Sequence, residues 1–301
     1  MFESRRLRLL VEFERRGTVT AVADALSYTP SAVSQQLAIL ERESGGPLFE
    51  RAGRTLLLTD AGRLLASHGE RVLAALERAG AELEAADGAV TGTVRMASFQ
   101  TVAMVLLPPA LRRLGEQHPG LVVQYLDAEA EATLPQLAAG EIDLVIAEEY
   151  EHAPRTRDAR LDRRFLANDE LLVALPEGHP LARRRAVPLD RLAAEPWVSA
   201  HPDTAYHDMV IRACRSLGGF EPDIRHSVND VVVMFELVAV GVVGIVPALG
   251  AHARPEGVVV RPIAGSAQQR EIFTVARATS ADRPAIAAVR DALSAAVEDV
   301  G

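Results

Sequence analysis

The stretch TVTAVADALSYTPSAVSQQLAILERESGGPLFERAGRTLLLTDAGRLL, residues 18–65, specifies how the N-terminal part of the chain folds. Thr18 precedes one amphipathic segment and Thr29 precedes another, in which Pro30 takes the first helical position, where its missing N–H does no harm. An earlier helix ends at Gly17, and the residues of its buried face are Leu7, Leu10, Val11 and Phe13. We therefore expect three short helices joined by tight turns.

The third helix has two unlike faces. Val33, Leu37 and Leu40 recur at helical spacing on its apolar face. The opposite face is small and polar, which lets a helix approach base edges, and glutamine can pair bidentately with adenine for ~1–3 kcal/mol of discrimination. We predict DNA contacts from this face and its cap by Thr29, Pro30, Ser31, Ser34, Gln35 and Gln36. Taken alone, the pattern does not exclude the alternative that this face is simply the solvent-exposed side of a helix in an ordinary helical bundle.

Two short apolar segments follow the third helix. Residues 48–51 and 55–58 flank a glycine at position 53, which predicts a β-hairpin, the wing of a winged helix-turn-helix. Arg51 and Arg54 would then reach phosphates or the minor groove, and solvated surface arginine is the alternative for each.

After the wing, Thr59 can cap a helix that continues without proline to about Asp87, a length of ~40 Å. Its apolar residues follow the spacing of a coiled-coil seam, interrupted by Gly62 and Gly69. The predicted dimerisation residues are Leu65, Val72, Leu76, Ala79 and Leu83, with Ala86 continuing the seam. Pairing with a second copy is the interpretation we favour over packing against the helix's own domain.

Residues 18–65 strongly resemble the LysR-type transcriptional regulators. The matching motifs are Ala-Val-Ser at 32–34, Leu-Glu at 40–41, Pro-Leu-Phe-Glu-Arg at 47–51 and Leu-Thr-Asp-Ala-Gly at 58–62. The resemblance implies a sequence-specific DNA-binding regulator that works as a homodimer or a homotetramer on a pseudo-palindromic promoter site. RNA polymerase is a further candidate partner.

The resemblance also implies a multidomain α plus α/β fold. We expect a winged helix-turn-helix DNA-binding domain at 1–58, a linker and dimerisation helix at 59–87, and a periplasmic-binding-protein-like effector domain at 88–301. Lobe 1 would comprise about 91–162 plus 268–301, because the last strand and helix return to it, and lobe 2 about 163–267.

The apolar patterns beyond residue 91 agree with this division, because strands alternate with helices as in an α/β domain with a parallel sheet. Strands are expected at 94–98, 122–126, 142–147, 165–175, 197–200, 224–228, 243–246 and 272–276. Helices are expected at 106–117, 133–139, 205–217, 230–240 and 282–300.

A cleft between such lobes gathers helix N-termini, whose N–H groups and dipoles suit carboxylates and other anions. We predict that a small-molecule effector lies there, in contact with Ser98, Phe99, Thr101, Ser199, His201 and Asn229. The alternative for each polar member is a plain helix cap. Glu148 and Glu149 follow a strand at the rim, where they could receive an amine, but we favour solvation.

Charge limits how the protein can hold DNA. The whole chain carries −9, while residues 1–58 carry eight arginines and seven acidic residues and are therefore near neutral. DNA affinity must consequently come from the placement of arginines and the pairing of two heads, not from bulk charge.

Several classes are excluded or disfavoured. Cys214 is the only cysteine, so an intrachain disulfide or two-cysteine redox switch is impossible, and we interpret it as a buried hydrophobe in the 205–217 helix. No apolar run approaches the roughly 20 residues of a membrane span and no secretory signal is recognisable, so cytoplasmic location is expected. Neither a metal-ligand motif nor a nucleotide-binding fingerprint occurs, and we expect no metal or cofactor.

An enzyme is the rival class. Ser98, His201 and Asp203 supply the residue types of a hydrolytic triad, but no G-x-S-x-G elbow holds the serine. The alternative function is therefore a cleft-containing α/β enzyme or hydrolase with an accessory DNA-binding domain. A stand-alone solute-binding protein would leave residues 1–87 unexplained.

Overall fold

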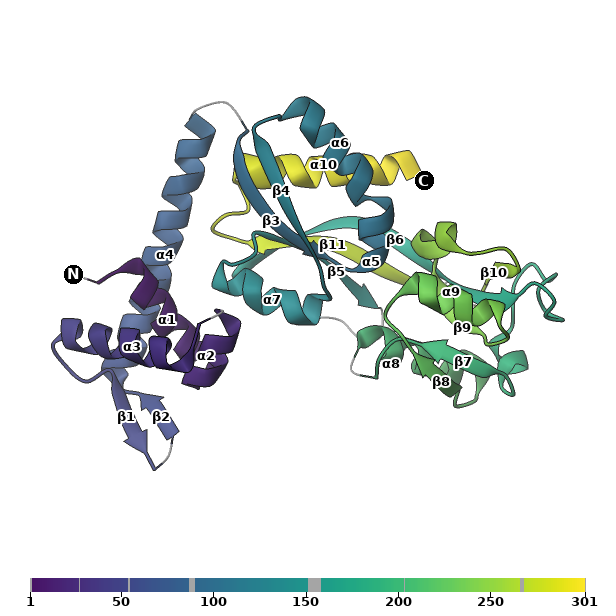
Figure 1. Cartoon of the computed structure of the whole chain (residues 1–301), viewed down its shortest axis with the longest axis horizontal. Helices are drawn as coiled ribbons and strands as arrows, with labels where there is room; N and C mark the ends of the chain where they lie inside the picture. Colours follow the sequence, from purple (N-terminus) through teal and green to yellow (C-terminus); the bar gives the residue numbers. More distant parts are fainter. Residues whose placement is uncertain are drawn as a thin grey trace.

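The computed structural model describes residues 2–26, 28–53, 55–86, 90–150, 158–202, 204–265 and 268–300. The predicted contact Arg54 and the triad candidate Asp203 lie outside these residues. A small head, here residues 2–58, is followed by one long helix and then by two α/β lobes (Figure 1). Among the described residues, no helix has the length and apolar character needed to span a bilayer.

The head forms as its capping residues predict. It consists of α1 (Ser4–Arg16), α2 (Val19–Ala25), α3 (Pro30–Ser44), β1 (Phe49–Ala52) and β2 (Thr55–Leu58). Thr18 Oγ1 accepts a hydrogen bond from the N–H of Ala21 at 3.1 Å, and Thr29 Oγ1 accepts one from that of Ala32 at 3.2 Å. Gly17 ends α1 in the left-handed region, with φ of 74°. The predicted helices, caps and hairpin are thus confirmed.

The long helix, α4 (Asp60–Ala86), has 27 residues and begins after Thr59, whose Oγ1 accepts from Gly62 N–H at 3.0 Å. Its first half packs against the head. A Cβ on Gly62 would lie 2.3 Å from the carbonyl oxygen of Leu48, and one on Gly69 would lie 3.3 Å from Val11 Cγ2. The two glycines therefore allow α4 to approach the wing and α1.

Lobe 1 carries a sheet in which β4, β3 and β5 are parallel and β11 is antiparallel to β5. Its elements are β3 (Gly92–Ser98), α5 (Gln100–Val105), α6 (Leu107–Gln117), β4 (Leu121–Asp127), α7 (Ala130–Ala139), β5 (Leu144–Tyr150), β11 (Gln269–Arg277) and α10 (Pro284–Val300). Helices α6 and α10 cover one face and α7 the other (Figure 1). The expected return of the last strand and helix to this lobe is confirmed.

Strand β6 (Leu161–Pro176) belongs to both lobes. Its residues 161–170 pair with β11, and residues 171–176 pair with β9 (Gly244–Pro247) and β10 (Val258–Pro262). The division near residue 163 stays a prediction, but the change of strand partner comes only after residue 170.

Lobe 2 is built around the second half of β6. Its other elements are β7 (Pro196–Ser199), α8 (Ala205–Ala213), β8 (Asp223–Ser227) and α9 (Val231–Ala239), with short helical turns at Leu189–Leu192, Cys214–Gly218 and Ala248–Ala253. Trp197 and Phe235 are fully buried at its centre. As expected for a small buried hydrophobe, Cys214 is fully buried, although it lies in a π-helical turn and not in α8.

Some predictions about the strands and helices were wrong. The sequence indicated neither α5, which has 6 residues, nor β10, which has 5, because periodicity is not distinctive in so short a segment. The sheet is also mixed and not purely parallel, since both β6 and β11 run antiparallel to their neighbours.

Candidate functional site

The exposed face of α3 lies on the outside of the head. Val33, Leu37 and Leu40 are buried as predicted. Five of the predicted DNA contacts are exposed, namely Thr29, Pro30, Ser31, Ser34 and Gln35. Gln36 differs from these residues, because it is half-buried and its Oε1 accepts a hydrogen bond from Arg6 Nε at 3.1 Å. A helix face with short polar side chains is therefore open to solvent.

The wing is held against α3 by Glu41, a residue whose role the sequence did not reveal. Glu41 Oε1 accepts hydrogen bonds from the N–H groups of Leu48 at 2.8 Å and Phe49 at 3.0 Å. The ring of Phe49 in turn meets that of Phe13 edge-on at 5.3 Å. This anchoring positions β1, on which Arg51 is exposed.

The second half of α4 leaves an apolar row uncovered. Val72 is 46% exposed, Leu76 55% and Leu83 73%, and Ala79 is exposed between them. Leu65 behaves differently, since it is half-buried against the core of the head. The row that could meet a second copy therefore begins near Val72, one seam position later than predicted.

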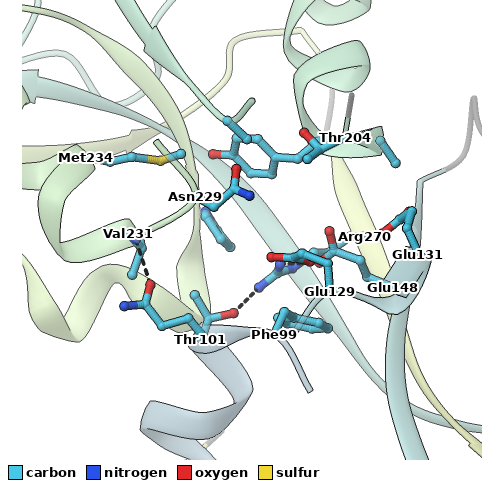
Figure 2. Close-up of a pocket in the computed structure, with 15 residues that line it drawn as sticks. Phe99, Thr101, Glu129, Glu131, Glu148, Thr204, Asn229, Val231, Met234 and Arg270 are labelled. Atoms are coloured by element: carbon cyan, nitrogen blue, oxygen red, sulfur yellow. Dashed lines mark hydrogen bonds and ion pairs between the residues drawn. The ribbon is translucent and has the colours of Figure 1, made fainter. Parts of the chain in front are cut away.

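A cavity of about 50 Å³ lies between the lobes (Figure 2). Of the predicted effector contacts, Phe99, Thr101 and Asn229 line it. Ser98 does not line it, because its buried hydroxyl lies near Phe99 O at 3.3 Å and Tyr125 Oη at 3.4 Å. The fold therefore brings Phe99, Thr101 and Asn229 to the cavity, whereas Ser98 lies outside its lining.

Ser199 and His201 also lie outside the lining. Ser199 is fully buried, and its hydroxyl has no hydrogen-bond partner in the part of the chain described. His201 is exposed, and its main-chain N–H donates to Asn229 Oδ1 at 3.0 Å. Ser98 and His201 stand on different lobes with separate partners, so they do not form the catalytic pair that the rival enzyme interpretation would need.

Arg270 is the central charged residue of the cavity, and sequence reasoning missed it. Only 3% exposed, it donates from Nε and Nη2 to Asp169 Oδ2 at 2.9 and 2.7 Å. It also donates from Nη2 to Thr101 Oγ1 at 2.7 Å and from Nη1 to Glu148. Its guanidinium lies 4.7 Å from the centre of the Phe99 ring. An arginine at the start of an apolar strand gives no local signal that its partners come from three other segments.

The predicted solvation of Glu148 and Glu149 was wrong. Glu148 is 8% exposed, pairs with Arg270 and accepts a hydrogen bond from Tyr150 Oη at 2.6 Å. Glu149 points to the other face of the sheet and pairs with Arg163. The physical reason is that β5 continues to Tyr150, so both carboxylates lie within the sheet and not on a loop beyond it.

Glu129 stands at the edge of the same cavity, just before α7. Burial, together with the charge of Glu148 and then that of Glu131, raises the pKa of its carboxyl to about 7, against a smaller lowering by Arg270. Within the described residues, no donor hydrogen-bonds to its side chain. It is therefore a partly buried carboxyl group without a counter-ion.

The chain itself occupies the N–H groups at the start of α9, whereas α5 and α7, which also begin at the cavity, have no side-chain cap. At the start of α9, Val231 N–H donates to Gln100 Oε1 of lobe 1 at 2.7 Å. The next two N–H groups, those of Val232 and Val233, donate to Asp230 Oδ1 at 2.8 and 3.1 Å. The start of α9 therefore offers no free N–H group to an anion, because the chain's own carboxylate and amide already cap it.

A winged helix-turn-helix, a long helix with an uncovered apolar row and two lobes around a cavity together define a helix-turn-helix protein with a ligand-binding domain. Two family models match the chain. Residues 4–63 match the bacterial regulatory helix-turn-helix protein of the lysR family, and residues 87–298 match the LysR substrate binding domain. The chain belongs to the LysR family.

Individual relatives agree with the family. The chain is similar to a probable RuBisCO transcriptional regulator of Synechocystis, with 31% identity over 64% of this chain and 55% of that protein. A probable hydrogen peroxide-inducible genes activator of Mycobacterium avium is 30% identical over 70% of this chain and 67% of that protein. The chain thus matches little more than half the length of the first relative and two thirds of the second.

A solved structure supports the fold along the whole chain. A full-length OxyR variant from Pseudomonas aeruginosa superimposes with a TM-score of 0.67 at 19% identity, covering 97% of this chain and 95% of that one.

Proposed function

We propose that this protein is a sequence-specific DNA-binding transcriptional regulator whose promoter binding responds to a small molecule held between its lobes. The observation that carries the proposal is the exposed face of α3 with its short polar side chains Ser31, Ser34 and Gln35, joined to a wing on which Arg51 is also exposed. Short polar side chains let a helix enter the major groove, and a neighbouring arginine can hold the backbone.

Two heads are needed for useful affinity, because residues 1–58 are almost neutral. The exposed row of Val72, Leu76 and Leu83 supports pairing of α4 with its copy in a homodimer, which suits a pseudo-palindromic promoter site. A homotetramer and contact with RNA polymerase are extensions of the same proposal. Action on promoter DNA would be cytoplasmic.

The effector would act by changing how the lobes close. The hydrogen bond from Val231 N–H to Gln100 crosses between α9 of lobe 2 and α5 of lobe 1, close to Phe99 and Thr101. A ligand that separates the lobes must break or bend this contact, and the resulting shift would reach the heads through β3 and α4. Such coupling is reciprocal, so DNA should change effector affinity by the same factor.

The effector is proposed to bind without covalent chemistry. Burial, followed by the charge of Glu221, raises the pKa of the Cys214 thiol to about 12, so it is not a thiolate near neutral pH. The two relatives above carry names that describe regulators, one of RuBisCO transcription and one of hydrogen peroxide-inducible genes. We accordingly propose a regulator and no enzymatic activity.

A gel shift with the DNA just upstream of the protein's own gene tests the proposal. We expect a shifted complex that weakens steeply as salt concentration rises, because bound arginines release counter-ions from the phosphates. Absence of any salt-sensitive complex would contradict the proposal.

A further inference from the structure

The charges around the cavity do not favour an anion. Among the residues that the structure describes, its lining contains three carboxyl groups, on Glu129, Glu131 and Glu148, and one guanidinium, on Arg270. That guanidinium already donates at four points, to Asp169 twice, to Thr101 and to Glu148, out of the five N–H groups that arginine has. A ligand carboxylate would have to displace one of these partners or sit beside them at a cost in repulsion.

One helix end that could have compensated for this repulsion, the start of α9, is also engaged. Three successive N–H groups at the start of α9 donate to Gln100 or to Asp230, and the Asp230 carboxylate adds another negative charge at that place. An anion would therefore meet neither a free guanidinium nor the positive end of this helix.

The carboxyl group of Glu129, in contrast, has no counter-ion among the described residues. Glu129 stands at the N-cap position of α7, where its main-chain oxygen accepts hydrogen bonds from the helix, but its side chain neither caps the helix nor accepts a hydrogen bond from the residues described. The groups acting on it are three neighbouring carboxyls, those of Glu148, Glu131 and Asp127, against the single arginine Arg270. Figure 2 shows Glu129 on the same side of the cavity as Arg270, with Val231 and Met234 on the other.

We infer that the cleft takes a small organic cation, an ammonium or guanidinium compound, and that Glu129 is the carboxylate that pairs with it. This inference rests on the proposed function, because it specifies the effector of the same cleft. The ring of Tyr206 in the lining adds a cation-binding surface, which is worth ~0.5–2 kcal/mol where water is excluded, whereas the ring of Phe99 already faces the guanidinium of Arg270.

The size of the cavity sets a condition on this ligand. A volume of about 50 Å³ is well below the ~150 Å³ that holds a benzene molecule, so a ligand larger than a few atoms either extends into solvent or parts the lobes. Pairing with Glu129 on lobe 1 while the apolar part of the ligand displaces α9 would loosen the Gln100 to Val231 hydrogen bond. The charge of the ligand would thereby be coupled to lobe opening.

The inference predicts a pH dependence with a definite sign. The carboxyl of Glu129 has a pKa of about 7 and pairs with a cation only when ionised. An amine ligand stays charged up to about pH 10, so its affinity should rise between about pH 6 and pH 8, by up to about tenfold for each unit below the pKa of Glu129. The affinity of a carboxylate ligand would fall over the same pH range, because the ionised carboxyl group of Glu129 would repel it.

The experiment measures thermal stability of the full-length protein with two matched series of small molecules. The cationic series is n-butylammonium and n-butylguanidinium, and the anionic series is n-butyrate and n-butyl phosphate, all at equal ionic strength. A ligand that binds only the folded state raises the melting temperature with concentration. We expect stabilisation by the cations, more at pH 8 than at pH 6, and none by the anions.

Variants assign the effect to Glu129. Glu129→Gln, which keeps the size of the side chain, should abolish stabilisation by cations, and Glu129→Asp should retain part of it. Glu170→Gln removes an exposed carboxylate on β6 outside the cavity and should leave the effect unchanged. Stabilisation by the anionic series, no stabilisation by either cation, or an undiminished cation effect in Glu129→Gln would each overturn the inference. A gel shift on the same preparation separates the two proposals. If the protein binds DNA but the cations do not stabilise it, the inferred ligand class is refuted and the proposed regulatory function stands.

Discussion

At the scale of single residues, Arg270 shows how a buried charge is kept in place. It brings together carboxylates from β5 and β6 and a hydroxyl from α5, and every one of these groups is itself largely buried. Burial lowers the pKa of Arg270, but the charges of Glu148 and Asp169 more than reverse this and raise it. The guanidinium of Arg270 therefore keeps its charge, and the two buried carboxyl groups that accept its hydrogen bonds compensate for the cost of burying it.

Replacing Arg270 with alanine should destabilise the protein severely. Asp169 would be left buried without the guanidinium with which it now pairs, which costs about 3–5 kcal/mol of unfolding free energy. Urea denaturation followed by circular dichroism measures the loss. The control is Arg225→Ala, which breaks an exposed pair with Asp223 and should cost less than about 1 kcal/mol. Equal losses in the two variants would contradict the role given to the buried cluster.

At the scale of elements, α3 and the wing are expected to divide the work of DNA binding. Gln35 is exposed at the middle of the α3 face, whereas Arg51 stands on the first strand of the wing. Base contacts give specificity, and backbone contacts give affinity for any sequence.

Gln35→Ala should therefore reduce discrimination between the specific site and single-base variants of it by about 1–3 kcal/mol, if its amide pairs with adenine. Arg51→Ala should weaken binding to all of these sequences alike and lower the salt dependence by about one counter-ion. Fluorescence anisotropy titrations on a panel of operators at several salt concentrations measure both effects. The same profile for the two variants would refute this division.

The packing of α4 on the head depends on a glycine. Gly62→Ala would place a methyl group 2.3 Å from the Leu48 carbonyl, so the wing must move, at a cost of about 1–3 kcal/mol. Gly80→Ala in the same helix meets nothing within 4 Å and should instead stabilise the helix by up to about 1 kcal/mol. Thermal melts of both variants test this, and opposite signs are the expected outcome.

At the scale of the whole molecule, the apolar row on α4 should decide the assembly. Leu76 is 55% exposed in the single chain, and a charge there would be buried in a dimer interface. Leu76→Arg should therefore shift the protein toward monomers in sedimentation analysis and weaken its DNA binding with it. Ser67→Arg adds the same charge at an exposed position on the opposite side of the helix and should leave the assembly intact. If the Leu76→Arg variant remained a dimer, the proposal that the apolar row of α4 forms the dimer interface would be contradicted.

The head also meets lobe 1 within one chain. Glu12 of α1 is 1% exposed and is bracketed by Arg15 and Arg16, whose guanidiniums also donate to the carbonyl oxygens of Ala138 and Pro135 in α7. Nothing in the local pattern of α1 distinguishes these arginines from solvated ones. Their partners lie 119 and 123 residues away, so only the folded chain reveals the contact.

Local sequence signals were enough to predict the head and the linker helix. Thr18, Thr29 and Thr59 cap the helices that follow them, and Val33 with Leu37 defines a buried face, because capping and periodicity act within a few residues. The lobes were also recognisable from alternating strands and helices. The sequence could not show that Leu65 packs on the head or that Gln36 turns toward Arg6.

The chemistry of the cleft, in contrast, emerged only from the folded chain. Arg270 meets partners 101, 122 and 169 residues away in sequence, and no local pattern encodes such a meeting. The sequence did not show that Asp230 and Gln100 occupy the N–H groups at the start of α9. The solvation expected for Glu148 was wrong because β5 runs further than its apolar residues indicate. Local forces thus specify which elements form, whereas the net charge of a cavity depends on which distant side chains the folded chain brings to it.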